Sequence, residues 1–407
     1  MAFSQCRSIR NASVYGDFAG QLAAGDDLHA FSQSAGDFAG SLVAGGSIMN
    51  AVIRGGNMLV NAVVDAGRYL RNLQITGGEF AGAVTAATAG FIRTGGLGIA
   101  NDAVSAGDLA WADVNIRGQA DRIDLGGAFT GFVDLGTAGS VTLGSLIDGA
   151  YVKVAGDADV ISVRDNGAHN SYVHVLGELG RLSMGGTQEG VVAVQRGIGI
   201  AQLMNLDNAV LMAGEDTGSL VVRGDAVESV LSFGTWIGDD LVYNSADDVI
   251  TGGSLGRAVF GGEFRDSALV AGVLPNVNVG TDIPNDMWAY IGNPNYDIAT
   301  TDAAEAGGML TSEIGLIVVR GNVVNTQPSA GRLSAAAAAD GIDRVLLRRR
   351  GTVLRTRDYT DPYGAPYVID VRTVNDSEVW LTFSEEMNSA SLSLAQDVDG
   401  NDSVNDP

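Results

Sequence analysis

The chain has 407 residues, of which 57 are glycine and only 7 are proline, and hydrophobic residues make up 46% of it. This composition excludes collagen-like and disordered chains and supplies enough apolar side chains for a buried core. The formal net charge of -24, from 24 basic and 48 acidic residues, argues against nucleic acid as a partner, because phosphate binding needs clustered lysine and arginine.

The N-terminal segment, MAFSQCRSIRNASVYGDFAG, lacks the apolar stretch of a signal peptide. Cys6 is the single cysteine, so no internal disulfide is expected, and this scarcity is typical of long exported bacterial surface proteins. No run reaches the roughly 18 apolar residues that would predict a membrane span. We therefore expect an extracellular or cell-surface location, with the export signal outside this chain.

A repeat marked by glycine runs through the first half of the chain. The units YGDFAGQLAAG and AGDFAGSLVAG are the clearest copies. The marker glycine recurs at steps of 18 to 22 residues, at Gly16, Gly36, Gly56, Gly78, Gly98, Gly118, Gly136, Gly156, Gly177 and Gly197. A fixed period of this length is the signature of a repeat architecture.

Short stretches of alternating apolar and polar residues fill each unit, and glycine turns end them, as in RNLQITGG, AYVKVAGD and GSLVVRGD. Alternation with a period of two indicates strands. A unit this small cannot bury its own inner face and must stack on its neighbours. The sequence therefore predicts an all-β fold, a parallel β-helix or β-solenoid with coils of about 20 residues, over residues 1–273.

The pattern breaks over residues 274–312, which we interpret as an irregular excursion loop. Trp288 and Tyr290 lie together in this loop and are the predicted ligand-binding residues, because aromatic rings can stack on sugars, although packing against the solenoid would also explain them. The pattern resumes over 313–347, the predicted last coil and cap. Residues 348–364, with the stretch RRRGTVLRTRD, form a basic linker or strand.

Residues 365–407 change style to two alternating strands with a turn at Asn375 and Asp376. This stretch resembles the start of a bacterial Ig-like domain of the S-layer type, whose hallmark is V-x-L-x-F-S-E-x-M. The matching residues are Val379, Leu381, Phe383, Ser384, Glu385 and Met387. The chain ends before a β-sandwich of about 100 residues is complete. The preceding repeats, in their style, resemble the repetitive surface proteins of planctomycetes, which implies a secreted or wall-associated location.

Two regions carry residue types that suggest chemistry. The first, VRDNGAHNSYVHVLGE, is the best candidate for the acid–base cluster of a β-helix enzyme, although a polar surface loop explains it as well; its members are Arg164, Asp165, His169, His174 and Glu178. The second, DVDGNDSVNDP, partly matches a calcium loop, with Asp397, Asp399 and Asp402 as predicted metal ligands. Repeated Gly-Asp turns suggest a further role for calcium in stabilising stacked carboxylates.

These patterns predict a structural or adhesive module of a secreted or cell-surface protein with no catalytic residues. The expected partners are cell-envelope or extracellular matrix components, polysaccharide among them. Two alternatives stay open: a β-helix carbohydrate-active enzyme, either a polysaccharide lyase or a glycoside hydrolase, and a calcium-dependent carbohydrate-binding module. Calcium is the one cofactor that the sequence suggests.

Overall fold

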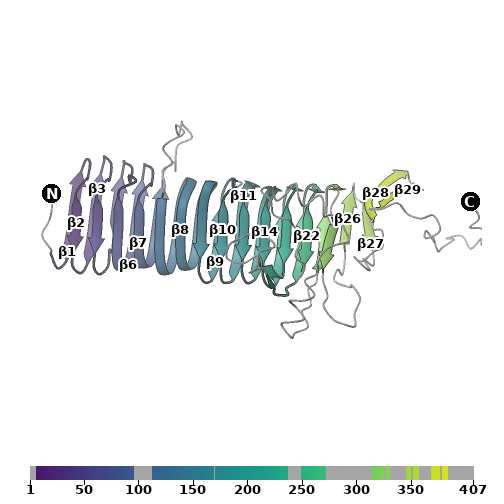
Figure 1. Cartoon of the computed structure of the whole chain (residues 1–407). Helices are drawn as coiled ribbons and strands as arrows, with labels where there is room; N and C mark the ends of the chain where they lie inside the picture. Colours follow the sequence, from purple (N-terminus) through teal and green to yellow (C-terminus); the bar gives the residue numbers. More distant parts are fainter. Residues whose placement is uncertain are drawn as a thin grey trace, which may run out of the picture.

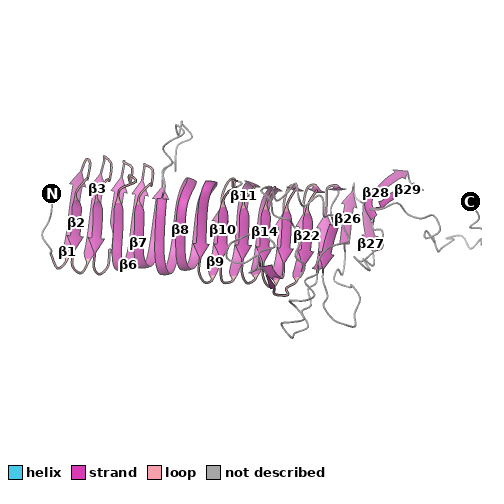
Figure 2. Cartoon of the chain, in the orientation of Figure 1, coloured by secondary structure: helices cyan, strands magenta, loops and turns pink. Residues whose placement is uncertain are grey.

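The computed structural model is an elongated stack of β-strands (Figure 1). It describes residues 6–95, 112–168, 170–236, 249–271, 314–324, 327–330, 345–349, 352–356, 368–375 and 378–383. All regular structure in this part of the chain is strand, with no helix (Figure 2). None of the described residues form a helix long and apolar enough to cross a bilayer.

The strands that build the first coils differ widely in length, from 4 residues in β2 to 43 in β8. Their bounds are β1 Ile9–Tyr15, β2 Gln21–Ala24, β3 Leu28–Ser34, β4 Ser41–Ala44, β5 Ala51–Arg54, β6 Val63–Thr76, β7 Ala83–Gly95, β8 Ala112–Val154, β9 Ala158–Val163, β10 Tyr172–Val175, β11 Leu179–Gln188, β12 Val191–Val194, β13 Ile198–Asp207 and β14 Val210–Ala213. The remaining strands are β15 Thr217–Val222, β16 Ala226–Val227, β17 Val230–Phe233, β18 Thr235–Trp236, β19 Val249–Ile250, β20 Leu255–Phe260, β21 Phe264–Arg265, β22 Ala268–Ala271, β23 Ile314–Val319, β24 Val323–Val324, β25 Gln327–Ala330, β26 Val345–Arg349, β27 Thr352–Thr356, β28 Val368–Asn375 and β29 Glu378–Phe383.

Each coil pairs in parallel with the next, which confirms the predicted β-solenoid. Residues that hydrogen-bond between neighbouring coils are typically 19 to 22 positions apart. Following one register position along the rod gives two uninterrupted series, Ile9, Leu28, Ile48, Leu70, Ala89 and Ala120, and then Ala138, Ala158, Leu179, Ile198, Thr217, Leu255 and Ile314. The glycine period seen in the sequence is therefore the coil length.

Inward-facing side chains form one hydrophobic core along the rod, from Leu22 to Val319. Alternation along each strand directs every second residue inward. The parallel register then stacks like on like, as with Leu22 on Leu42 and Leu42 on Val64. Shortening one such buried leucine to alanine typically costs about 2–5 kcal/mol.

Aromatic rings fill the core at the first corner of the N-terminal coils. Phe18 stacks on Phe38 with ring centroids 5.4 Å apart, and Phe31 meets both edge-on. Phe18 and Phe38 belong to the two copies of the GDF motif, and Phe31 lies in β3, the strand between them. The motif therefore supplies both a turn and a core ring.

The Gly-Asp turns carry a ladder of hydrogen bonds from coil to coil. Asp17 Oδ1 accepts from the Asp37 N–H, Asp37 Oδ1 accepts from the Asn57 N–H, and Asn57 Oδ1 accepts from the Glu79 N–H, at 2.8 to 2.9 Å. Later acceptors of the same kind are Asp157, Asn166, Asn205, Asp216 and Asp225. Asparagine can replace aspartate because the turn needs an acceptor oxygen.

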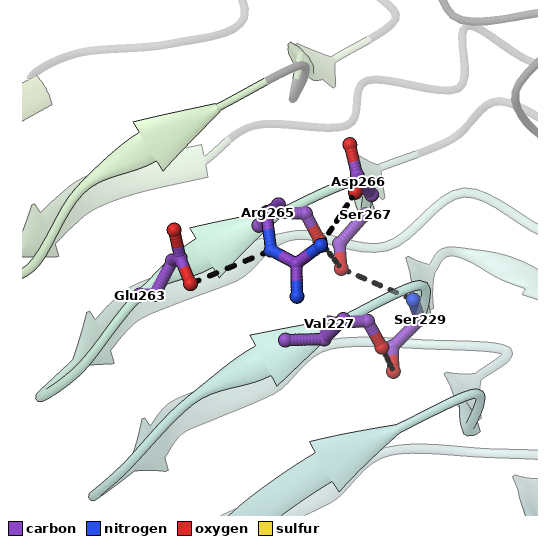
Figure 3. A network of polar contacts seen from close by, with 6 residues as sticks. All are labelled: Val227, Ser229, Glu263, Arg265, Asp266 and Ser267. Atoms are coloured by element: carbon purple, nitrogen blue, oxygen red, sulfur yellow. Dashed lines mark hydrogen bonds and ion pairs between the residues drawn. The ribbon is translucent and has the colours of Figure 1, made fainter.

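The corner before β17 and β22 has a ladder of serines instead (Figure 3). Ser229 donates its backbone N–H to Ser267 Oγ at 3.0 Å, and each hydroxyl donates to a carbonyl two residues back. Arg265 lies between Glu263, at 3.4 Å, and Asp266, at 3.1 Å. This network joins two neighbouring coils. Its polar residues therefore have a structural role, which is to hold the two coils together.

Long insertions interrupt the coils without breaking the register. The chain leaves the coil after Phe233 and returns at β20, where Phe260 pairs with Val222; Ala271 of β22 then pairs with Phe233. It leaves again after Ala271 and returns at β23, which pairs with β20. The excursion predicted for 274–312 lies outside the described residues.

At the C-terminal end, β26 pairs in parallel with β23 and antiparallel with β27. β26 and β27 lie in the segment predicted to be the cap and the linker. β28 and β29 pair antiparallel on either side of the expected turn. Assignment of this hairpin to an Ig-like domain stays a prediction.

Candidate functional site

Three aromatic side chains form a column on the outer surface of β8 and β10. Tyr151 and Tyr172 are register partners on neighbouring coils, with ring centroids 6.2 Å apart, and Phe132 lies 5.7 Å from Tyr151. Each is followed by a buried valine, so strand alternation directs the ring away from the core. We call Phe132, Tyr151 and Tyr172 the aromatic strip.

The strip is partly open to solvent. Phe132 is 42% exposed, and both tyrosines are partly exposed. The inner rings Phe31 and Phe38, by contrast, are completely buried. The strip therefore presents ring surface that the core rings do not.

A polar column lies beside the strip, two residues further along each strand. It contains Asp134, Lys153 and His174, and Lys153 and His174 are register partners. Lys153 is the only lysine of the chain. Its ammonium group makes no ion pair with any residue that the structure describes.

His174 links the strip to the covered part of the same face. Its Nδ1 atom lies 3.1 Å from the Tyr151 hydroxyl, and its ring stacks on Trp236 with centroids 5.3 Å apart. The imidazole is only 2% exposed. His174 is therefore held in one orientation by partners on two sides.

Trp236, on β18, covers an apolar patch on the outside of the following coils. The indole is 5% exposed. The patch consists of Ala193, Val210, Met212, Val230, Ala268 and Val270. His174 thus marks the boundary between two parts of the outer face. On one side lies the apolar patch that Trp236 covers, and on the other lies the aromatic strip with its polar neighbours, which is partly exposed to solvent.

The predicted enzyme cluster does not converge. Arg164 pairs with Asp124 at 2.7 Å, two coils away, and Arg122 reaches the other oxygen of that carboxylate at 3.5 Å. Glu178 donates its backbone N–H to Asp157 in a turn, while His174 faces Trp236 from β10.

The other two members of that cluster add nothing to a site. The carbonyl of Asp165 accepts a hydrogen bond from the buried Gln188 side chain. His169 lies outside the described residues. The described members therefore serve separate corners and faces of the rod.

The remaining predicted site residues, Trp288, Tyr290, Asp397, Asp399 and Asp402, lie outside the described residues. In the described ranges no three His, Cys, Asp or Glu side chains are grouped so as to hold a metal ion. The turn carboxylates Asp17 and Asp37 instead accept hydrogen bonds from the next coil. The calcium sites suggested by the sequence stay predictions.

The comparisons with known proteins add no assignment. No protein-family model matches the chain, no curated protein matches it, and no solved structure matches it. The candidate site therefore rests on the geometry of its own residues.

Proposed function

We propose that the chain is a rod-like structural and adhesive module of a secreted or cell-surface protein. The observation that carries this proposal is the continuity of the solenoid: one hydrophobic core runs from Leu22 to Val319, and a single hydrogen-bonded sheet includes both β1 and β26. Such a stack gives a stiff rod whose length grows with the number of coils, because each coil of about 20 residues adds one strand spacing of about 4.8 Å.

Surface charge and cysteine content support an exposed setting. A net charge of -24 keeps long rods from associating with one another. A chain with the single exposed thiol of Cys6 forms no internal disulfide that a change of redox conditions would break. The likeness of the repeats to planctomycete surface proteins points the same way.

The proposal is tested by shape and by location. X-ray scattering from the full chain should give a radius of gyration well above the roughly 22 Å expected for a globular protein of this length. Antibodies against the solenoid should label intact cells of the source organism, or its culture medium. A compact particle, or antigen found only after lysis, would overturn the proposal.

The two alternatives have direct tests of their own. Turnover of polyuronides or neutral glycans would establish an enzyme. Glycan binding that needs millimolar calcium and is lost in chelator at equal ionic strength would establish a calcium-dependent carbohydrate-binding module. The described residues favour neither, because their turn carboxylates accept backbone hydrogen bonds and Arg164 is paired with Asp124.

A further inference from the structure

We infer that the aromatic strip, together with Asp134 and Lys153, binds a neutral, extended polysaccharide that lies along the rod. This inference rests on the proposed adhesive function and names the ligand class of its binding face.

The geometry fits a linear polymer. Phe132, Tyr151 and Tyr172 come from three consecutive coils and follow one another along the rod axis, with centroid spacings of 5.7 and 6.2 Å. A ligand that contacts all three must itself extend along the axis. Sugar rings with equatorial hydroxyls present apolar C–H faces that pack on aromatic rings, and a β-linked glucan holds such rings in an extended ribbon.

Packing between coils does not by itself account for this column. The core rungs Phe31 and Phe38 are buried, and their ring area contributes to the core. Phe132 instead leaves 42% of its surface in water. Exposed aromatic surface bordered by polar groups is typical of a recognition site.

The polar groups beside the rings suit hydroxyl ligands. Lys153 donates, Asp134 accepts, and the Tyr172 hydroxyl can do either. These groups lie within two strand positions of the rings on three neighbouring coils. A polysaccharide offers donors and acceptors at a similar density along its edge.

Charge selects a neutral polymer. The one acid and one base beside the strip, Asp134 and Lys153, cancel, and the chain as a whole carries -24. A polyuronate would be repelled by this field, whereas a neutral glycan would not. Trp236 stacks on His174 and bounds the strip on one side, so the ligand lies over Phe132, Tyr151 and Tyr172.

The test is affinity electrophoresis and titration calorimetry of the full chain with hydroxyethyl cellulose and a soluble mixed-linkage β-glucan. Dextran, which is α-linked and coiled, and alginate, which is anionic, serve as comparison polymers. We expect both β-glucans to bind, with little dependence on salt, and dextran and alginate to bind more weakly. No binding of either β-glucan, or stronger binding of alginate that salt abolishes, would overturn the inference.

Variants locate the site. Phe132→Ala and Tyr172→Ala should each weaken β-glucan binding about tenfold, as expected for loss of one stacked ring. Tyr172→Phe should lose less, because it keeps the ring. The matched control is Ile200→Ala, which removes an equally exposed apolar side chain, 42%, from β13.

Circular dichroism and amide exchange identify any variant that disturbs the coils. Equal binding by the two ring variants and by Ile200→Ala would place the ligand elsewhere and refute the assignment. Scattering and cell labelling are independent of this result. A rod on the cell surface that binds no β-glucan would leave the proposed function standing without this site.

Discussion

The Oδ1 atom of Asp17 accepts a hydrogen bond of 2.9 Å from the backbone N–H of Asp37, the equivalent residue one coil further along. Asp37 repeats the contact with Asn57. The Asp or Asn that follows the turn glycine therefore links neighbouring coils: its side-chain oxygen satisfies a backbone donor that the tight turn leaves without a strand partner. A large part of the repeat's acidity at these turns has this structural cause.

Asp37→Ala should loosen the turn that contains Asn57, whereas Asp37→Asn should largely preserve it. Alanine removes the acceptor of the Asn57 N–H and costs about 1 kcal/mol, while asparagine keeps an oxygen there, as Asn57 itself does for Glu79. Hydrogen exchange of the Asn57 amide measures the effect locally.

Asp65→Ala is the control for the loss of a carboxylate. Asp65 points outward from β6 and none of the described hydrogen bonds or ion pairs involve its side chain. It should leave the Asn57 amide unchanged. Equal exchange in all three variants would show that the ladder does not stabilise the turn.

Gly36→Ala should destabilise the solenoid much more than Gly55→Ala. Both glycines are left-handed, with φ of 77° and 74°, so each alanine has a similar backbone cost of about 1–2 kcal/mol. A Cβ at Gly36 would also come within 2.5 Å of Asp17 Oδ1, whereas at Gly55 its nearest neighbour is 3.7 Å away.

Denaturant unfolding of the two glycine variants, side by side, measures the difference. Gly55→Ala controls for the left-handed backbone, because both positions belong to neighbouring coils of one corner. Equal midpoints would mean that the approach of Asp17 to Gly36 has no energetic consequence.

The coil could be predicted from the sequence because its causes are local. Strand alternation and glycine turns repeat every coil, so a period read from Gly16, Gly36 and Gly56 is also the period of the structure. The spacing of Phe132, Tyr151 and Tyr172 is one coil as well. Aligning the repeats and searching each outward column for aromatic residues would have found the strip.

Contacts that leave the repeat could not be predicted in this way. Trp236 reaches His174 from an insertion that breaks the period, so no spacing relates the two residues. Arg164 and Asp124 are two coils apart, and pairing them requires knowing which corner each one occupies. The residues of the candidate enzyme cluster, from Arg164 to Glu178, are close together in the sequence, but the path of the coil places the described ones on different corners and faces of the rod.

Gln33→Leu should destabilise the N-terminal coils by about 2 kcal/mol or more. Gln33 is fully buried in a column whose neighbours are Val14 and Ile53, so leucine fits the column. The Gln33 Nε2 group lies 2.9 to 3.1 Å from three backbone carbonyls, those of Gly16, Gly36 and Asp37. Leucine would leave these acceptors in the corner without that donor.

Thermal unfolding and exchange of the amides around Gly36 measure this loss. The control is Ser34→Ala, which changes an exposed side chain of the same strand. Stability equal to or above that of the unaltered chain would show that an apolar column outweighs the hydrogen bonds that the Gln33 amide donates at this corner.

Arg164→Ala should cost about 1–2 kcal/mol, more than Arg122→Ala, and Asp124→Asn should restore part of the loss. The Asp124 side chain is 7% exposed; Arg164 contacts it at 2.7 Å and Arg122 at 3.5 Å. Without Arg164 the carboxylate stays largely buried with only the longer contact, which is unfavourable.

Both arginines are about half exposed, so the expected loss is smaller than for a fully buried pair. In the double variant, asparagine removes the buried charge, and Arg164→Ala should then cost less than it does beside Asp124. Denaturant unfolding of the single and double variants gives the coupling energy directly. Additive losses would mean that Asp124 is stabilised by the surrounding coil rather than by Arg164.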